Sequence, residues 1–159
     1  MSDGLQLRLA RPQDAVAVLA VVHQAFAQYD GKLVPQSGAA RETVETVTAR
    51  LARENCVLAF RDERLVGCLF YEHLGDHLYF GRLAVLPEER GRGVARRLVA
   101  EVEAVALAAG IATVALNVRI ALPSNAALFA ALGYCEVSRH AHPGFADPTS
   151  IRMEKQVGP

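Results

Sequence analysis

Residues 83–98 read LAVLPEERGRGVARRL, which is an apolar run, then a turn with two glycines, then the first residues of a helix-forming segment. Pro87 stops the apolar run, because its backbone nitrogen cannot donate to a strand ladder. After the turn, apolar residues recur at helical spacing on one face, at Val94, Leu98, Val102 and Val105. The stretch therefore predicts a strand, a turn and a long helix in direct succession.

The turn has the features of an anion site. The first N–H groups of a helix have no internal acceptor, and the helix dipole adds partial positive charge there. Gly91 and Gly93 place no Cβ in the way of a phosphate. Further positive charge comes from Arg90, Arg92, Arg96 and Arg97. The plainer alternative is a solvated, well-capped helix start whose arginines only keep the surface soluble, but the combination favours a phosphate-binding turn.

Two common phosphate loops do not fit this turn. A nucleotide-binding P-loop needs Gly-Lys-Ser/Thr, which residues 83–98 lack, and a dinucleotide fingerprint needs a third glycine where Arg96 stands. The pattern Arg90-x-x-Gly93-x-Ala95 resembles instead the acetyl-CoA motif of the GNAT superfamily of N-acetyltransferases, which reads Gln/Arg-x-x-Gly-x-Gly/Ala.

The resemblance covers nearly the whole chain and implies how acetyl-CoA binds. Residues 125–134 resemble the second cofactor segment of the family, and residues 151–155 resemble its final strand. Backbone groups of residues 83–85 would pair with the pantetheine arm, and amides of residues 90–96 would hold the pyrophosphate. The implied cofactor-binding residues are Leu83, Ala84, Val85, Arg90, Gly91, Arg92, Gly93, Val94, Ala95, Arg96, Asn125 and Phe129.

The resemblance also implies the chemistry. In the family a free amine attacks the thioester directly within a ternary complex, so a base or a water chain must take the proton of the amine. Some members place a glutamate four positions before the residue that matches Leu83, and that position here is Tyr79. The candidate catalytic residues are Tyr79 and Glu72, with His73 and His77 as nearby substitutes. The alternative is that Glu72 and the histidines are solvated turn residues.

A second departure concerns the general acid. The family often uses a tyrosine to protonate the leaving thiolate, and that position here is Phe129, which cannot donate a proton. A coenzyme thiol with a pKa of about 8.5 can leave without a dedicated acid. The departures at Tyr79 and Phe129 keep open the alternative of a non-catalytic module that senses acyl-CoA. Asn125 either reaches the pantetheine arm or caps a helix.

The remaining sequence alternates strand and helix signals. Strands are expected at residues 5–9, 56–60, 65–71, 78–86, 113–118, 134–140 and 149–154, and helices after residue 12 and at 42–53, 92–110 and 125–133. A change in apolar parity across Gly81-Arg82 predicts a β-bulge. We expect an α+β fold with a GNAT-like mixed, mostly antiparallel sheet of about six to seven strands and about four helices, as a single domain over residues 1–159.

Composition limits the partners. Seventeen basic and seventeen acidic residues cancel, so no overall field attracts nucleic acid or an anionic membrane. No apolar stretch is long enough to span a bilayer and no targeting leader is recognised, so we expect a cytoplasmic protein. The cysteines Cys56, Cys68 and Cys135 lie in apolar runs, which predicts buried reduced thiols. A homodimer through an apolar helix face or the last strands is a further expectation.

The resemblance to the GNAT superfamily implies one activity. The chain is expected to move an acetyl group from acetyl-CoA to a primary amine of a small molecule, peptide or protein. No metal is expected, because His140 and His142 alternate along a strand without a third ligand of convincing spacing.

Overall fold

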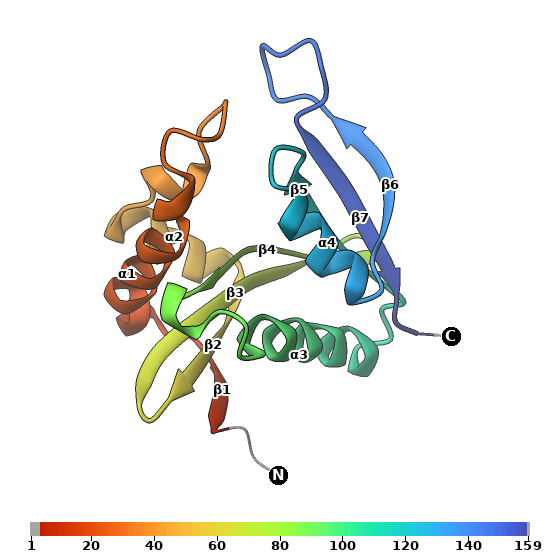
Figure 1. The fold of residues 1–159 in the computed structure, drawn as a ribbon. Coiled ribbons are helices and arrows are strands. Elements are labelled where there is room, and N and C mark those ends of the chain that lie inside the picture. The colour runs from red at the N-terminus through yellow and green to blue at the C-terminus, as the bar shows by residue number, and fades with distance from the viewer. Residues whose placement is uncertain (1–3, 159) are drawn as a thin grey trace. The chain divides into compact units, whose positions relative to one another are not determined.

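The computed structural model describes residues 4–158 and has an α+β architecture (Figure 1). Within these residues the strands form one seven-stranded sheet in the order β1-β2-β3-β4-β5-β7-β6. The strands are β1 (Leu5–Leu9), β2 (Asn55–Arg61), β3 (Arg64–Leu74), β4 (His77–Val85), β5 (Thr113–Arg119), β6 (Cys135–His140) and β7 (Ser150–Gln156). The α-helices are α1 (Ala15–Phe26), α2 (Val44–Arg53), α3 (Val94–Ala108) and α4 (Pro123–Ala131). The predicted fold class is confirmed.

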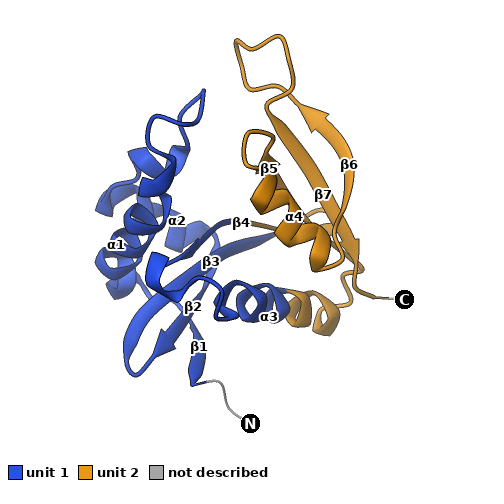
Figure 2. Cartoon of the chain, in the orientation of Figure 1, with its two compact units in different colours: residues 1–72, 82–102 blue, residues 73–81, 103–159 orange. Residues whose placement is uncertain are grey.

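The chain divides into two compact units (Figure 2). Unit 1 comprises the residues up to 72 together with 82–102, and unit 2 comprises residues 73–81 together with those from 103 onward. The expectation of a single domain over residues 1–159 stays a prediction.

Unit 1 contains α1, α2, the antiparallel strands β1 and β2, most of β3, the end of β4 and the first part of α3. Strand β1 pairs with β2 from Leu5↔Arg61 to Leu9↔Val57, and β2 pairs antiparallel with β3. The core of the unit is apolar and fully buried, and its large members are Val18, Val22, Val47, Val57, Leu58, Val66, Leu69, Phe70, Val94 and Leu98. Burial of this size dominates the folding free energy, at about 1.5 to 3 kcal/mol for each large side chain.

Unit 2 contains the first part of β4, the strands β5, β6 and β7, and helix α4. Strand β4 runs parallel to β5 from His77↔Thr113 to Tyr79↔Ala115, whereas β5–β7 and β6–β7 are antiparallel. An aromatic cluster forms much of its core: the ring centroids of Phe80 and Phe129 lie 5.8 Å apart and those of Phe80 and Tyr134 lie 5.9 Å apart.

Several local expectations needed correction. Strand β3 runs to Leu74, so Glu72 lies on a strand and not in the expected polar turn. Leu122 is the N-cap of α4 without a side-chain cap bond, so Asn125 does not cap this helix. Cys56 and Cys68 are buried as expected, but Cys135 is exposed because it lies on the outermost strand β6.

The irregularity expected at Gly81-Arg82 has a counterpart in the backbone, since Arg82 has a φ of 55°. The expected change of parity in burial is absent. Ala84 is buried like Leu78 and Phe80, whereas Leu83 and Val85 are only half-buried.

Candidate active site

The candidate site in unit 1 is built where β4 gives way to α3. Strand β4 ends at Val85, a short 3₁₀ helix η4 (Pro87–Glu89) follows, and α3 begins at Val94. The Arg97 N–H donates to the Gly93 carbonyl at 3.0 Å, the first bond of the helical ladder. The N–H groups of residues 94–96 therefore have no intrahelical acceptor, which is the arrangement that an anion requires.

Gly91 and Gly93 shape the turn before the helix. Their φ angles are 76° and 86°, in the left-handed region that favours glycine. A Cβ added at either position would have no heavy atom within 4 Å beyond its chain neighbours, so the backbone faces open space. The turn therefore fits a phosphate that approaches the main chain closely.

The side chain of Arg90 binds the end of helix α1. Its guanidinium donates from Nη2 to the Ala25 carbonyl at 3.0 Å and from Nη1 to Gln28 Oε1 at 3.2 Å. Its backbone N–H donates to the Pro87 carbonyl at 3.3 Å. Arg90 thus ties the turn to the end of α1. Its own N–H already has an acceptor inside the turn, so the N–H groups left for an anion begin at Gly91.

Two residues that the sequence did not single out hold the turn in place. Glu89 is only 5% exposed, and its carboxylate lies 2.9 Å from Arg61 Nε and 3.3 Å from Arg92 Nη1. Gly67 on β3 allows α3 to approach, because a Cβ there would lie 2.9 Å from Val94 Cγ1. A glycine inside an apolar strand run is the sequence signal for such a close approach.

The candidate catalytic residues lie on strands. The Asn117 side-chain amide on β5 donates to the Tyr79 hydroxyl at 3.2 Å, within unit 2. In unit 1, Glu72 is half-buried on β3. Burial raises the pKa of Glu54, and the nearby negative charge of Glu72 adds to this rise. His77 lies 3.0 Å from Asp76 through Nδ1.

Phe129 and Asn125 lie on α4. Phe129 is 6% exposed and packs edge-on against Tyr134, with ring centroids 6.3 Å apart. The Tyr134 hydroxyl donates to Glu103 at 2.8 Å. Burial raises the pKa of the Tyr134 phenol, and the hydrogen bond to Glu103 raises it further. Asn125 is half-buried in the first turn of the helix. Phe129 and Tyr134 therefore act as core residues of unit 2.

The residues 4–158 contain no cluster of three or more His, Cys, Asp or Glu side chains that could hold a metal ion. His140 Nε2 lies 2.8 Å from Ser138 Oγ, and His142 contacts Thr149 Oγ1 through Nδ1. Every helix in this part of the chain is too short or too polar to cross a membrane.

Comparison with known proteins identifies the family. The model of the acetyltransferase (GNAT) family matches residues 20–134, which include both the turn and α4. The chain belongs to the GNAT acetyltransferase family. It is therefore an acyltransferase by class.

Solved structures show the GNAT fold over the full length. The PaiA N-acetyltransferase from Thermoplasma acidophilum, solved with coenzyme A, has a TM-score of 0.80 at 18% identity and covers 98% of this chain and 99% of its own. The ribosomal-protein-S18-alanine N-acetyltransferase from Escherichia coli has a TM-score of 0.79 at 18% identity and covers 98% of this chain and 95% of its own. A spermidine N-acetyltransferase chimera of Vibrio cholerae SpeG and hSSAT has a TM-score of 0.74 at 15% identity and covers 97% of this chain and 96% of its own. A search of curated protein sequences gave no significant match.

Proposed function

We propose that this GNAT chain transfers the acetyl group of acetyl-CoA to a primary amine of a small molecule, peptide or protein, by direct attack within a ternary complex. The observation that carries the proposal is the succession of β4, an open glycine turn and the N-terminus of α3. Bound acetyl-CoA would supply an activated thioester. The binding of coenzyme A by the PaiA enzyme, which shares the fold, supports this choice of donor.

The turn would hold the pyrophosphate through main-chain N–H groups of residues 91–96. Charge-assisted bonds from N–H groups to an anion are roughly twice as strong as neutral ones. The side chains of Arg92 and Arg96 are exposed and add positive charge there. Backbone groups of residues 83–85 would pair with the pantetheine arm as though it were an added strand. We keep Asn125 and Phe129 as proposed contacts of the cofactor.

Proton transfer is assigned to Tyr79 and Glu72. An amine with a pKa near 10.4 is mostly protonated at neutral pH, so the reaction needs a proton acceptor. Glu72 offers a carboxylate for this role. The Tyr79 hydroxyl accepts a hydrogen bond from Asn117, which orients it to donate or relay a proton. Asn117 is thus a positioning residue for Tyr79.

The class of acceptor is proposed from chemistry alone. The names of the structural relatives specify a ribosomal-protein alanine in one case and spermidine in another, and both present an amine. We propose a cytoplasmic enzyme without nucleic-acid or membrane partners, in keeping with a formal net charge of zero.

A matched pair of variants tests the proposed cofactor site. Gly93 and Gly144 both have a φ of 86°, and an added Cβ would contact nothing within 4 Å at either position. Gly93→Ala and Gly144→Ala should therefore incur the same backbone cost of about 1 to 2 kcal/mol. We expect only Gly93→Ala to weaken acetyl-CoA binding in calorimetry, by about tenfold or more, because charge-assisted bonds are lost. Equal dissociation constants for the two variants would refute the site.

Thiol release with a panel of amines tests the transfer. The panel contains a polyamine, a short diamine and a peptide with N-terminal alanine. Release of free coenzyme A thiol with at least one amine supports the proposed reaction. Thermal protection by acetyl-CoA without thiol release for any amine would favour the acyl-CoA sensor instead.

A further inference from the structure

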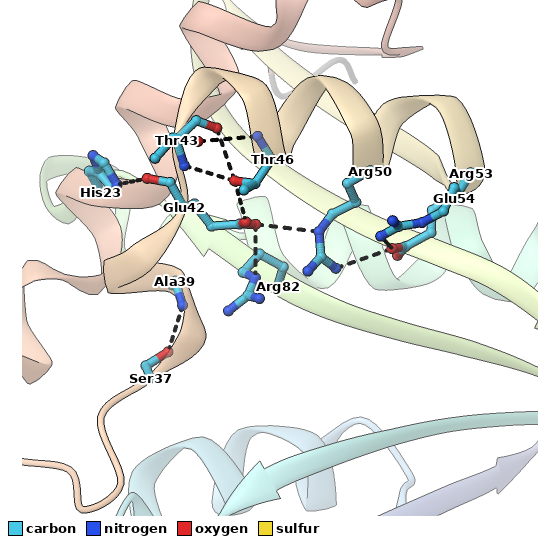
Figure 3. Close-up of polar contacts among 10 residues, drawn as sticks. All are labelled: His23, Ser37, Ala39, Glu42, Thr43, Thr46, Arg50, Arg53, Glu54 and Arg82. Atoms are coloured by element: carbon cyan, nitrogen blue, oxygen red, sulfur yellow. Dashed lines mark hydrogen bonds and ion pairs between the residues drawn. The ribbon is translucent and has the colours of Figure 1, made fainter.

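A buried carboxylate lies at the centre of an ion cluster in unit 1 (Figure 3). Glu42 is 8% exposed, and its Oε1 accepts a hydrogen bond from the Thr46 hydroxyl at 2.8 Å. Its Oε2 lies 3.3 Å from Arg50 Nε and 3.7 Å from Arg82 Nε. One carboxylate therefore attracts two guanidinium groups, in surroundings where charges are only weakly screened.

Glu42 is held in place from several elements. Its backbone carbonyl lies 2.9 Å from His23 Nε2 on α1. The next residue, Thr43, caps α2 and exchanges hydrogen bonds with Thr46 in a capping box. The backbone of Glu42 is thus held by α1, and its carboxylate is held by Thr46 and Arg50 of α2 in addition to Arg82.

Arg82 lies on β4, directly before the residues 83–85 to which we assign the pantetheine arm. Its φ of 55° is in the left-handed region, which is costly for a residue with a Cβ. Its side chain is 18% exposed and points toward Glu42 (Figure 3). The backbone of the 3₁₀ helix η3 (Gly38–Arg41) also approaches this side chain, since a Cβ at Gly38 would lie 3.3 Å from Arg82 Nη2.

We infer that Arg82 is a positioning residue for acetyl transfer: the Glu42-centred cluster holds its left-handed backbone and thereby orients the backbone of residues 83–85 toward the thioester. The inference rests on the proposed function. A strained backbone conformation persists only where surrounding contacts hold it, and the contacts of the Arg82 side chain supply that restraint. The pyrophosphate is held separately by the turn, so Arg82 should affect turnover more than coenzyme affinity.

Two substitutions at Arg82 separate backbone from side chain. Arg82→Gly removes the guanidinium but leaves a residue that adopts the left-handed region freely. Arg82→Ala removes the guanidinium and keeps the conformational cost. We expect Arg82→Ala to lower kcat about tenfold, because the productive conformation becomes about tenfold less populated, and Arg82→Gly to lower it only about twofold. Dissociation constants for coenzyme A should change less than kcat does in both variants, because the pyrophosphate contacts at the turn remain intact.

Glu42→Gln tests the cluster without touching the strand. The amide keeps the size of the side chain but loses the charge that attracts Arg82, so we expect kcat to fall, as it does in Arg82→Ala. The matched control is Arg53→Ala, which removes an arginine from α2, the helix that also carries Arg50. The Arg53 side chain is 67% exposed and lies 3.9 Å from Glu54. Arg53→Ala should leave kcat unchanged.

Each outcome has a distinct meaning. Equal kcat in Arg82→Ala and Arg82→Gly, with coenzyme binding intact, would overturn the backbone role of Arg82. Wild-type kcat in Glu42→Gln would overturn the role of the cluster. If the wild-type protein does not bind coenzyme A, the proposed function itself is contradicted. Thermal melting of each variant identifies any variant that fails to fold.

Discussion

Gly67→Ala provides the most direct test of how β3 positions the turn. A Cβ at residue 67 would lie 2.9 Å from Val94 Cγ1, 3.1 Å from the Ala84 carbonyl oxygen and 3.3 Å from Leu98 Cδ1. Val94 and Leu98 are fully buried, so neither side chain can move into solvent. The added methyl group must therefore push the start of α3 away from the sheet.

The expected magnitude follows from two opposing effects. Overpacking a core by one methyl group costs about 1 to 3 kcal/mol. Replacing glycine by alanine recovers about 0.4 to 1 kcal/mol, because the unfolded chain loses conformational freedom. Gly67 does not have a positive φ, so no further backbone cost arises. The two ranges leave a net loss centred near about 1.3 kcal/mol and at most about 2.6 kcal/mol; the central value corresponds to about 3 to 5 °C in Tm for a domain of this size.

Thermal melting and calorimetry with coenzyme A measure both consequences. Displacement of α3 should also weaken coenzyme binding, because the N–H groups of its first turn move together with Val94. Gly158→Ala is the matched control, since its added Cβ would meet Ala112 Cα at an ordinary 3.5 Å and its φ is also outside the left-handed region. A Gly67→Ala protein that melts at or above the wild-type temperature would refute the close-packing explanation.

Three further predictions follow from individual contacts. Arg90→Ala should weaken coenzyme A binding by a few fold in calorimetry without abolishing it, because the turn loses its side-chain anchor on α1; unchanged affinity would contradict the anchoring role. The pKa of Asp14 lies below its ordinary value, chiefly because its carboxylate accepts a hydrogen bond from Arg8. The ionised carboxylate therefore stabilises the folded protein above about pH 4, and this contribution is lost as pH falls through the lowered pKa. Asp14→Asn should thus lower the urea midpoint at pH 7 and match wild type near pH 2, and a constant difference would contradict this linkage. Tyr134→Phe should lower Tm by about 2 to 4 °C through loss of the bond to Glu103, worth about 1 kcal/mol, and an unchanged Tm would show that this bond contributes nothing.

The strand, turn and helix could be predicted because their signals are local. Pro87 ends a strand and two glycines form a turn wherever they occur in such a context, and the apolar stripe of α3 marks a helix by its spacing alone. The structure places these elements within a few residues of the predicted bounds. The second cofactor segment was harder to interpret, because Asn125 follows Pro123, which begins α4 and moves the cap to Leu122.

The supports of the site could not be predicted because they come from distant parts of the chain. Glu89 belongs to an acidic pair in which Glu88 is exposed, and no local pattern indicates that Glu89 alone turns inward to Arg61. Arg82 and Glu42 are forty positions apart by residue number, and the sequence indicated only that the backbone near residue 82 is irregular. Such pairings depend on strand register and helix placement, which local propensity does not specify.

The turn and the strand beside it therefore depend on different parts of the sequence. Anion binding at residues 91–96 needs only main-chain N–H groups and two glycines, so most side-chain changes in the turn should leave it intact. Orientation of residues 83–85 depends on Arg82, whose backbone is held through Glu42 by residues from α1 and α2. Because these contacts lie outside the cofactor motif, a GNAT chain could keep the motif and bind coenzyme while changes around Glu42 alter its rate of transfer.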